Sequence, residues 1–123
     1  MKTRHFRDLI VWQRSMKLAA VVYAATKDFP KDEMFGLTSQ IRRAAVSVPS
    51  NIAEGHGRLT DNGFAVFLGQ ARGSLFEVET QIEIAITLGY IKATDARKII
   101  AECDEVGKML NGLLNTLKER PVH

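Results

Sequence analysis

The sequence predicts an all-α protein, an antiparallel up-down-up-down four-helix bundle. Four segments, near residues 8–28, 33–56, 61–88 and 95–118, place apolar residues at alternating three- and four-residue steps, which keeps them on one face of a helix. No segment alternates apolar and polar residues better than it fits a helix, so no strand is expected. The connections between the segments are short, and short connections force neighbouring helices to be antiparallel.

The first helix is expected to begin after Asp8, whose carboxylate can cap it, and to stop before Pro30. One stripe on this helix is predicted to face the core of the bundle. It comprises Leu9, Trp12, Met16, Ala19 and Tyr23.

The second helix contains a proline, Pro49, which has no backbone N–H and crowds the carbonyl of Ala45. We expect this helix to be kinked near Pro49 and to stay on the core. The alternative is a break, with Ser47 capping a restarted turn. Glycine near residues 55–57 is expected to supply a left-handed exit. The predicted core stripe is Leu37, Ile41, Ala45, Val48 and Ile52.

The third helix is expected to be capped by Thr60 or Asp61 and to end at Gly89, and the fourth to be capped by Thr94 or Asp95. Each carries one core stripe. These are Phe64, Leu68, Ala71, Leu75, Val78, Ile82 and Ala85 on the third, and Ile99, Cys103, Val106, Leu110, Leu113 and Leu117 on the fourth. Gly69 and Gly73 also lie in the third helix, where each costs roughly 1 kcal/mol. We interpret them as sites of close approach by a neighbouring helix.

The composition indicates one domain spanning residues 1–123. With 46% hydrophobic and 25% charged residues, the chain lies in the range of ordered globular proteins. Its longest apolar run, residues 18–25, is too short to span a bilayer, and the first residues lack the apolar core of a secretory signal. The single Cys103 excludes an internal disulfide and suits a reducing compartment. We therefore expect a cytoplasmic protein without a membrane partner.

A second apolar stripe on the first two helices predicts self-assembly. The stripe is rotated by about 100° from the predicted core stripe on the first helix. Its members there are Val11, Leu18, Val22, Ala25 and Phe29, with Ser15 among them, and on the second helix Phe35, Val46, Pro49 and Ala53. Either these residues wrap deeper into the bundle or they contact another subunit. Because the first stripes already supply a core, we expect a homo-oligomer interface.

The net charge of +3 is unevenly distributed along the chain. Residues 1–58 hold ten basic and five acidic residues, whereas residues 59–123 hold seven basic and nine acidic ones. The basic half predicts either an anionic partner or an attraction between basic and acidic helices within the bundle. Arg42, Arg43 and Arg58 are the candidate contacts to the phosphates of RNA or DNA. Equally, they can be solvated or paired with acidic residues.

No catalytic constellation is found in the sequence. The serines lack a partnering base, no glycine loop precedes a phosphate-binding lysine, and Cys103 falls on a core stripe. No cofactor and no metal are expected. The competing hypothesis is a metal-dependent enzyme in which carboxylates of the third and fourth helices hold Mg²⁺. Its ligands would be Glu79, Glu83, Glu102 and Glu105.

Several motifs of this chain resemble those of one bacterial family. They include Phe6-Arg-Asp-Leu-Ile-Val-Trp12, Gly36-Leu-Thr-Ser-Gln-Ile-Arg-Arg-Ala-Ala45, Ser47-Val-Pro-Ser-Asn-Ile-Ala-Glu-Gly55, Gly73-Ser-Leu-Phe-Glu77 and Leu88-Gly-Tyr-Ile91. This combination resembles the four-helix-bundle proteins first noticed as products of intervening sequences in 23S ribosomal RNA genes.

The resemblance implies a small cytosolic bundle that assembles as a ring of five. It also implies kinship with the accessory protein of diversity-generating retroelements, which binds a reverse transcriptase and nucleic acid. The family supplies no catalytic residues. We therefore expect a non-enzymatic homo-oligomeric scaffold that binds RNA, DNA or a protein, and a purely structural assembly is a third alternative.

Overall fold

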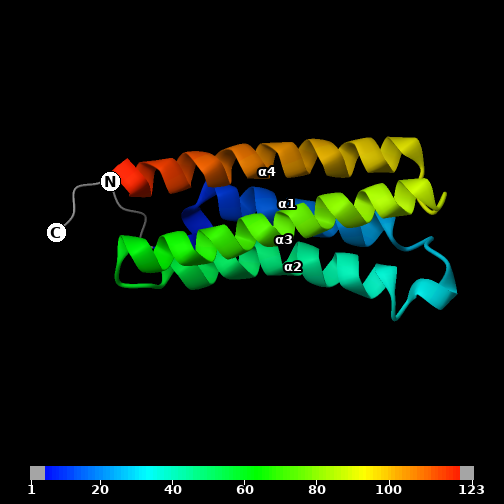
Figure 1. The fold of residues 1–123 in the computed structure, drawn as a ribbon, viewed down its shortest axis with the longest axis horizontal. Coiled ribbons are helices and arrows are strands. Elements are labelled where there is room, and N and C mark those ends of the chain that lie inside the picture. Colours follow the sequence, from blue (N-terminus) through cyan, green and yellow to red (C-terminus); the bar gives the residue numbers. More distant parts are fainter. Residues whose placement is uncertain (1–4, 120–123) are drawn as a thin grey trace.

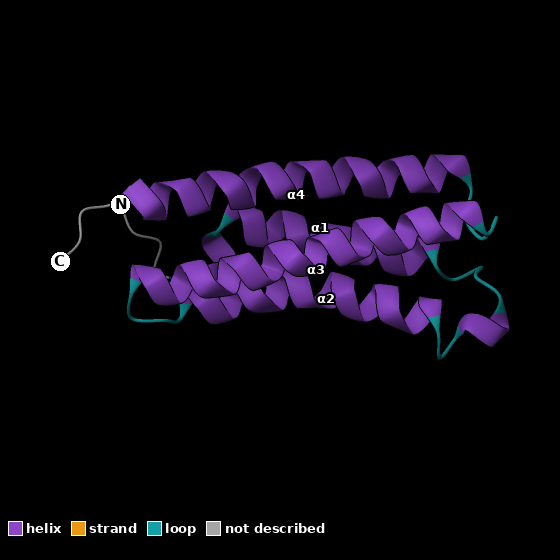
Figure 2. Ribbon diagram, in the orientation of Figure 1, coloured by secondary structure: helices purple, strands orange, loops and turns teal. Residues whose placement is uncertain are grey.

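The computed structural model describes residues 5–119, which form four α-helices and no strand (Figure 2). The all-α class is therefore confirmed. The helices are α1 (Ile10–Ala25), α2 (Leu37–His56), α3 (Asp61–Thr87) and α4 (Ala93–Glu119). Two short 3-10 turns, η1 (Phe6–Asp8) and η2 (Lys31–Glu33), precede α1 and α2.

Successive helices run in alternate directions along the long axis of the molecule (Figure 1). Each helix packs against two others, in the cycle α1–α2–α3–α4–α1, and within residues 5–119 the backbones of the diagonal pairs do not come close to each other. The four inner faces therefore enclose one core. Each helix keeps one face that no other part of the described chain covers.

The core stripes predicted for α2, α3 and α4 are confirmed. Their members are buried, apart from Leu37, Phe64 and Leu113, which are half-buried at the edges of the core. Eight of the largest apolar side chains on these helices have no exposed surface, and their burial supplies the main favourable free energy of folding. These are Ile41, Ile52, Leu68, Leu75, Ile82, Ile99, Leu110 and Val106.

The inner face of α1 differs from the prediction. Met16 and Tyr23, placed in the core by the first stripe, are 46% and 43% exposed. The buried face consists instead of Val11, Ser15, Leu18 and Val22. The Ser15 hydroxyl is buried without penalty because it donates to the carbonyl of Val11, four residues earlier, at 2.7 Å.

Pro49 lies inside an uninterrupted helix. α2 runs from Leu37 to His56 with Pro49 buried in its third turn from the end, so the predicted alternative of a break near Ser47 is wrong. The kink at this position stays a prediction.

Two of the predicted helix ends are confirmed and three are wrong. The Thr60 hydroxyl caps α3 by accepting from the Gly63 N–H at 3.0 Å, and Gly89 has a positive φ of 74° directly after that helix. By contrast, Gly57 ends α2 with a right-handed φ of −76°. Asp8 lies in η1 and does not cap α1, whose N-cap residue is Leu9 without a side-chain hydrogen bond. Thr94 and Asp95, expected to cap α4, lie inside that helix, which begins at Ala93.

Glu33 joins three segments at the end of the bundle opposite to Thr60. One carboxylate oxygen accepts from the backbone N–H of Leu37 at 3.1 Å, at the start of α2, and the other accepts from the Tyr90 hydroxyl at 2.9 Å. The Tyr90 ring also lies 5.8 Å from the ring of Phe29, centre to centre. The bond to Glu33 and, after it, burial raise the pKa of Tyr90.

Candidate functional site: the outer surface of α2 and α3

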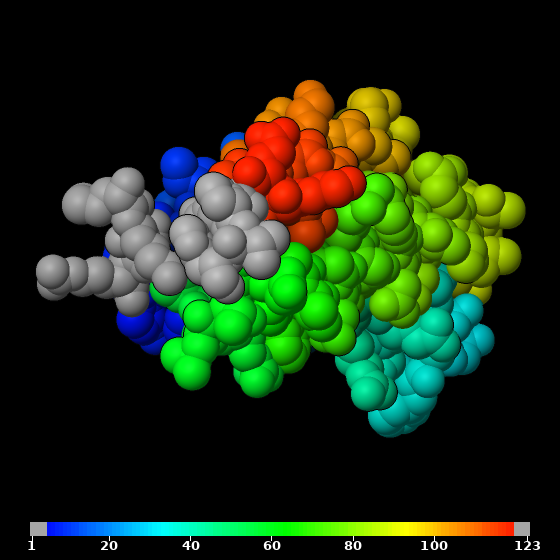
Figure 3. All heavy atoms as spheres, turned by 60° about the vertical axis from the view of Figure 1, so that its left-hand side comes forward, coloured from blue at the N-terminus to red at the C-terminus, as the bar shows by residue number. Residues whose placement is uncertain are grey.

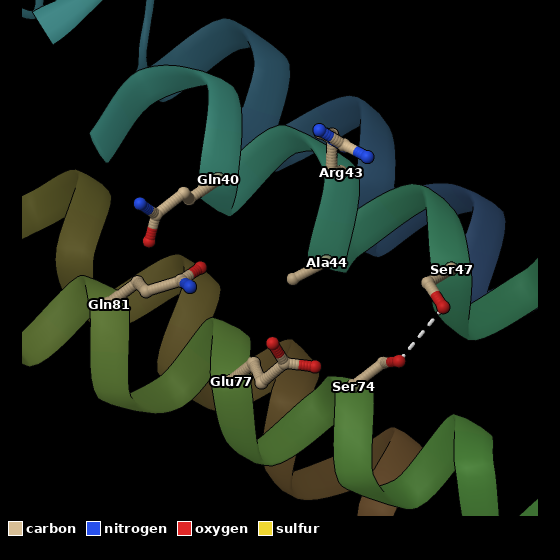
Figure 4. A pocket seen from close by; sticks show the side chains of 7 residues that line it. All are labelled: Gln40, Arg43, Ala44, Ser47, Ser74, Glu77 and Gln81. Carbon is tan, nitrogen blue, oxygen red and sulfur yellow. Dashed lines mark hydrogen bonds between the residues drawn. The ribbon is translucent and has the colours of Figure 1, made fainter. Parts of the chain in front are cut away.

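A cleft opens between α2 and α3, although these helices share the most extensive contact in the bundle. It has a volume of about 440 Å³, and the surface is indented between the teal atoms of α2 and the green atoms of α3 (Figure 3). α2 and α3 both supply its lining (Figure 4). The residues are Gln40, Arg43, Ala44 and Ser47 from α2, and Ser74, Glu77 and Gln81 from α3.

Paired serines close one end of this cleft. The Ser74 hydroxyl donates to the Ser47 hydroxyl at 2.9 Å (Figure 4). The Asn51 side-chain amide donates to the same oxygen at 2.9 Å. A serine nucleophile needs a base that accepts its proton, whereas Ser74 donates to another hydroxyl. This arrangement ties α2 to α3 and does not activate either serine.

The open part of the cleft carries both charges and two amides. Arg43 is exposed and makes no ion pair within residues 5–119, and Glu77, across the cleft on α3, is exposed as well. The Gln81 side-chain oxygen is buried and accepts no hydrogen bond from the described residues. The cleft therefore presents a positive group, a negative group and neutral amides. Such a combination matches the mixed surface of a protein better than a run of phosphates.

An apolar stripe continues from the cleft along the outer face of α3. We call it the α3 stripe, and its members are Val66, Gly69, Gly73, Phe76, Thr80 and Ile84. Phe76 is 49% and Val66 59% exposed. The Thr80 hydroxyl donates to the carbonyl of Phe76 at 2.8 Å, so this side chain also presents mainly its methyl group. A hollow of about 300 Å³ beside the stripe is lined by Gly73, Phe76 and Ile84, among others.

The two glycines of the α3 stripe face open space. A methyl group added to Gly69 or Gly73 would meet no atom of residues 5–119 within 4 Å, so the predicted close approach of a neighbouring helix does not occur among the described residues. Gly55, at the end of α2, makes that kind of contact instead. A methyl group there would lie 2.7 Å from Cβ of Phe67.

The structure does not bring the three predicted phosphate-binding arginines together. Arg42 faces α1, where its Nε donates to the Thr26 hydroxyl at 2.8 Å and its guanidinium stacks 4.7 Å from the Tyr23 ring. Arg58 lies beyond the other end of α2 and pairs with Glu54 at 3.2 Å. Only Arg43 borders the cleft. About 20 Å of helix separates Arg42 from Arg58 at a rise of 1.5 Å per residue.

Five of the eight predicted interface residues are buried inside the single chain. Val11, Leu18, Val22, Phe29 and Pro49 lie in its interior, so they have no free surface to give to a subunit interface. This corrects their assignment: they take the core positions that the other stripe of α1 was expected to fill. Phe35 is 94% exposed, Val46 is exposed and Ala53 half-buried, so these three stay predictions as contacts.

Two of the four carboxylates proposed as metal ligands interact with other residues of the bundle. Glu102 accepts ion pairs from Arg14 and Lys17, each at 3.4 Å, which neutralise it and tie α1 to α4. The pKa of Glu79 is raised, first by burial and second by the nearby carboxylate of Asp104. Across residues 5–119 no three potential metal ligands gather at one point.

Cys103 is buried on the inner face of α4, as predicted. Burial first, and then the carboxylates of Glu79 and its neighbours, raise the pKa of this thiol to about 12. A thiol of that pKa is almost entirely protonated near neutral pH, so it is a poor nucleophile.

In the part of the chain that the structure describes, no helix is both long and apolar enough to cross a membrane.

Comparison with known proteins identifies the family of this chain. Residues 7–112 match the family model of the 23S rRNA-intervening sequence protein. The chain belongs to that family. A similar fold occurs in the crystal structure of a protein with unknown function from the S23 ribosomal protein family of Bacteroides thetaiotaomicron VPI-5482. The two share 23% identity and a TM-score of 0.79 over 86% of this chain and 96% of that chain, which shows a common fold. No curated protein matches the chain.

The 23S rRNA-intervening sequence family was thus correctly indicated by the motifs, whereas the cleft was missed. Gln40, Glu77 and Gln81 are polar residues one position beside the core stripes, where most helices carry solvated side chains. A polar residue at such a position on each of two facing helices is the signal that predicts a polar gap between them.

Proposed function

We propose that this protein is a non-enzymatic scaffold that assembles with copies of itself and presents a composite surface to a protein or nucleic-acid partner. The observation that carries the proposal is the α3 stripe, an apolar face that the four-helix core does not use. Contiguous apolar surface of this kind marks interaction sites in globular proteins. The family resemblance implies five copies.

Two glycines on the exposed face of α3 support the same proposal. Gly69 and Gly73 each destabilise α3 by roughly 1 kcal/mol relative to alanine and make no compensating contact within the chain. A neighbouring subunit that approaches α3 closely would supply that contact.

The mass of the protein in solution tests the proposal. We expect sedimentation to give a mass several times that of the 13.7 kDa chain. Phe76→Glu places a charge on the α3 stripe and should dissociate the assembly while circular dichroism shows unchanged helicity. Ala101→Glu introduces the same charge on the exposed face of α4 and is the control. Wild-type protein that stays monomeric at high concentration would refute the proposal.

One observation favours nucleic acid as the partner, namely that Arg43 is exposed and makes no ion pair within residues 5–119. Assembly would place several copies of it on one particle, where weak contacts act together. Retardation of RNA or DNA in about 50 mM salt, falling steeply as salt rises, is the expected result. Arg43→Gln should weaken it, and Arg97→Gln, on α4, should not. Absence of retardation by the intact oligomer would leave a protein partner.

A further inference from the structure

Two opposite helices of the bundle each leave an apolar outer face uncovered. One is the α3 stripe. The other lies on α1 and consists of Met16, Ala20 and Tyr23, which we call the α1 face. α1 and α3 lie diagonally across the bundle, so their outer faces belong to different sides of the molecule.

The two faces differ in relief. The α1 face projects long side chains, since Met16 and Tyr23 are both nearly half exposed. The α3 stripe also projects Val66 and Phe76, but it is hollowed between them, because Gly69 and Gly73 have no side chain and a cavity of about 300 Å³ lies beside Gly73 and Phe76. A ridge of side chains packs into a groove more closely than two ridges pack together.

The two helices also differ in charge. α1 contains no acidic residue, but its basic residues Arg14 and Lys17 are paired with Glu102 of α4. The α1 face itself carries a basic group from α2, because the Arg42 guanidinium stacks 4.7 Å from the Tyr23 ring.

α3 contains four acidic residues and a single basic one, Arg72, whose guanidinium stacks on Phe76 of the α3 stripe. Of the acidic residues, Glu77 and Glu83 are exposed beside the α3 stripe. Two α1 faces opposite each other would bring two Arg42 side chains together, whereas an α1 face opposite an α3 stripe brings Arg42 towards Glu77 and Glu83.

We propose that the α1 face of one copy docks on the α3 stripe of the next copy. This inference rests on the proposed function and adds the two surfaces and their pairing. Because the contact joins different surfaces, it is heterologous, and an open assembly has one free α1 face at one end and one free α3 stripe at the other until it closes. Nucleic acid is a poorer occupant of the α3 stripe, since Glu77 and Glu83 would repel phosphates.

Cross-linking between separately labelled subunits tests the pairing. Met16→Cys and Gly73→Cys are prepared as two proteins, one with a tag that separates their masses, mixed until subunits exchange, and treated with a short bis-maleimide. Both positions are exposed, and Gly73 has room for a side chain. Ala20→Cys with Gly69→Cys provides a second pair one turn away. Wild type, whose Cys103 is buried, controls for the native thiol.

The expected product is a covalent dimer containing one copy of each variant, with no dimer from either variant alone. The double variant Met16→Cys/Gly73→Cys should give a ladder of higher multiples. Asn111→Cys, on the exposed side of α4, mixed with Met16→Cys should give no product.

Three results would overturn the inference. Dimers formed by one variant alone show that identical surfaces meet. An oligomer that neither cysteine pair cross-links shows that other surfaces meet, and it leaves the proposed scaffold standing. A monomeric wild type removes both the pairing and the scaffold, so sedimentation of the wild type distinguishes the two failures.

Discussion

The contact between α2 and α3 is tight at one end and open at the other. Near the connecting loop, Gly55 lets α3 approach so closely that an added methyl group would lie 2.7 Å from Cβ of Phe67 and 3.0 Å from the Phe64 ring. Towards the other end the same two helices enclose the cleft between Gln40 and Gln81. The size and polarity of the residues at each level thus set the separation of one helix pair.

This contrast separates a level where close packing stabilises the fold from a level where polar side chains leave a gap between the helices. At the tight end, apolar rings pack on a glycine, and any added atom must displace a neighbour. At the open end, polar side chains hold the helices apart and one buried oxygen, that of Gln81, lacks a hydrogen bond from residues 5–119. Substitutions at the two ends should therefore act in opposite directions.

The largest expected effect is that of Gly55→Ala at the tight end. The new methyl group would collide with Cβ of Phe67, which is fixed to the backbone and moves only if α3 moves. We expect a loss of roughly 1–3 kcal/mol in the free energy of unfolding, even though alanine favours the helix by about 1 kcal/mol. Urea denaturation at fixed protein concentration measures it.

Gly112→Ala, on α4, is the matched control, because it adds the same atom to an exposed helical glycine with nothing within 4 Å. It should raise the stability of the folded chain by up to about 1 kcal/mol. Equal effects at both positions would mean that the close approach at Gly55 does not determine the α2–α3 separation.

A smaller effect of opposite sign is expected from Gln81→Leu at the open end. The substitution removes a buried oxygen that accepts no hydrogen bond from the described residues, and it adds apolar surface beside the core residue Ile82. Leaving such an acceptor unpaired costs about 1–3 kcal/mol, so a gain of about 1 kcal/mol is expected for this partly exposed side chain. Gln70→Leu, fully on the surface of α3, should leave urea denaturation almost unchanged. A destabilised Gln81→Leu would show that the amide is used in the fold.

The sequence was sufficient to predict α2, α3 and α4 but not the orientation of α1. On α2 and α4, charged and polar residues occupy the outer side, so the core stripe is easily recognised. On α3 the core stripe is long enough to be recognised even though a second apolar stripe lies on its outer face. α1 carries apolar residues around most of its circumference, and two stripes fit the same spacing equally well. The polar residues Gln13 and Lys17 lie opposite Val11 and Ser15, and their position favours the observed buried face. Ser15 obscured this pattern, because a polar residue is not expected on a buried face.

The outer surface was harder to predict because it depends on what the helices leave uncovered. The spacing of Gly69 and Gly73 indicated a close contact, but only the structure shows that no helix of this chain makes it. Arg42 and Arg43 are adjacent in sequence, yet about 100° of helix rotation sends one to α1 and the other to the cleft. Neither outcome follows from the periodicity of one helix alone.

The smallest expected effect lies on the side of α3 that faces α4, where charge rather than size distinguishes the positions. Burial and the neighbouring carboxylate of Asp104 raise the pKa of Glu79, so the folded protein holds this proton more tightly than the unfolded chain does. The contribution of Glu79 is therefore most favourable at low pH and is lost as the pH rises through the folded-state pKa, because the ionised carboxylate then opposes folding.

Glu79→Gln mimics the protonated form and should raise the free energy of unfolding at pH 7 by less than about 1 kcal/mol. That gain should vanish near pH 4, where the wild-type carboxyl is itself protonated in the folded state. Urea denaturation at the two pH values measures the difference, with Glu83→Gln, exposed on the outer side of α3, as the control. A gain that is equal at both pH values would show that ionisation of Glu79 does not cause the effect.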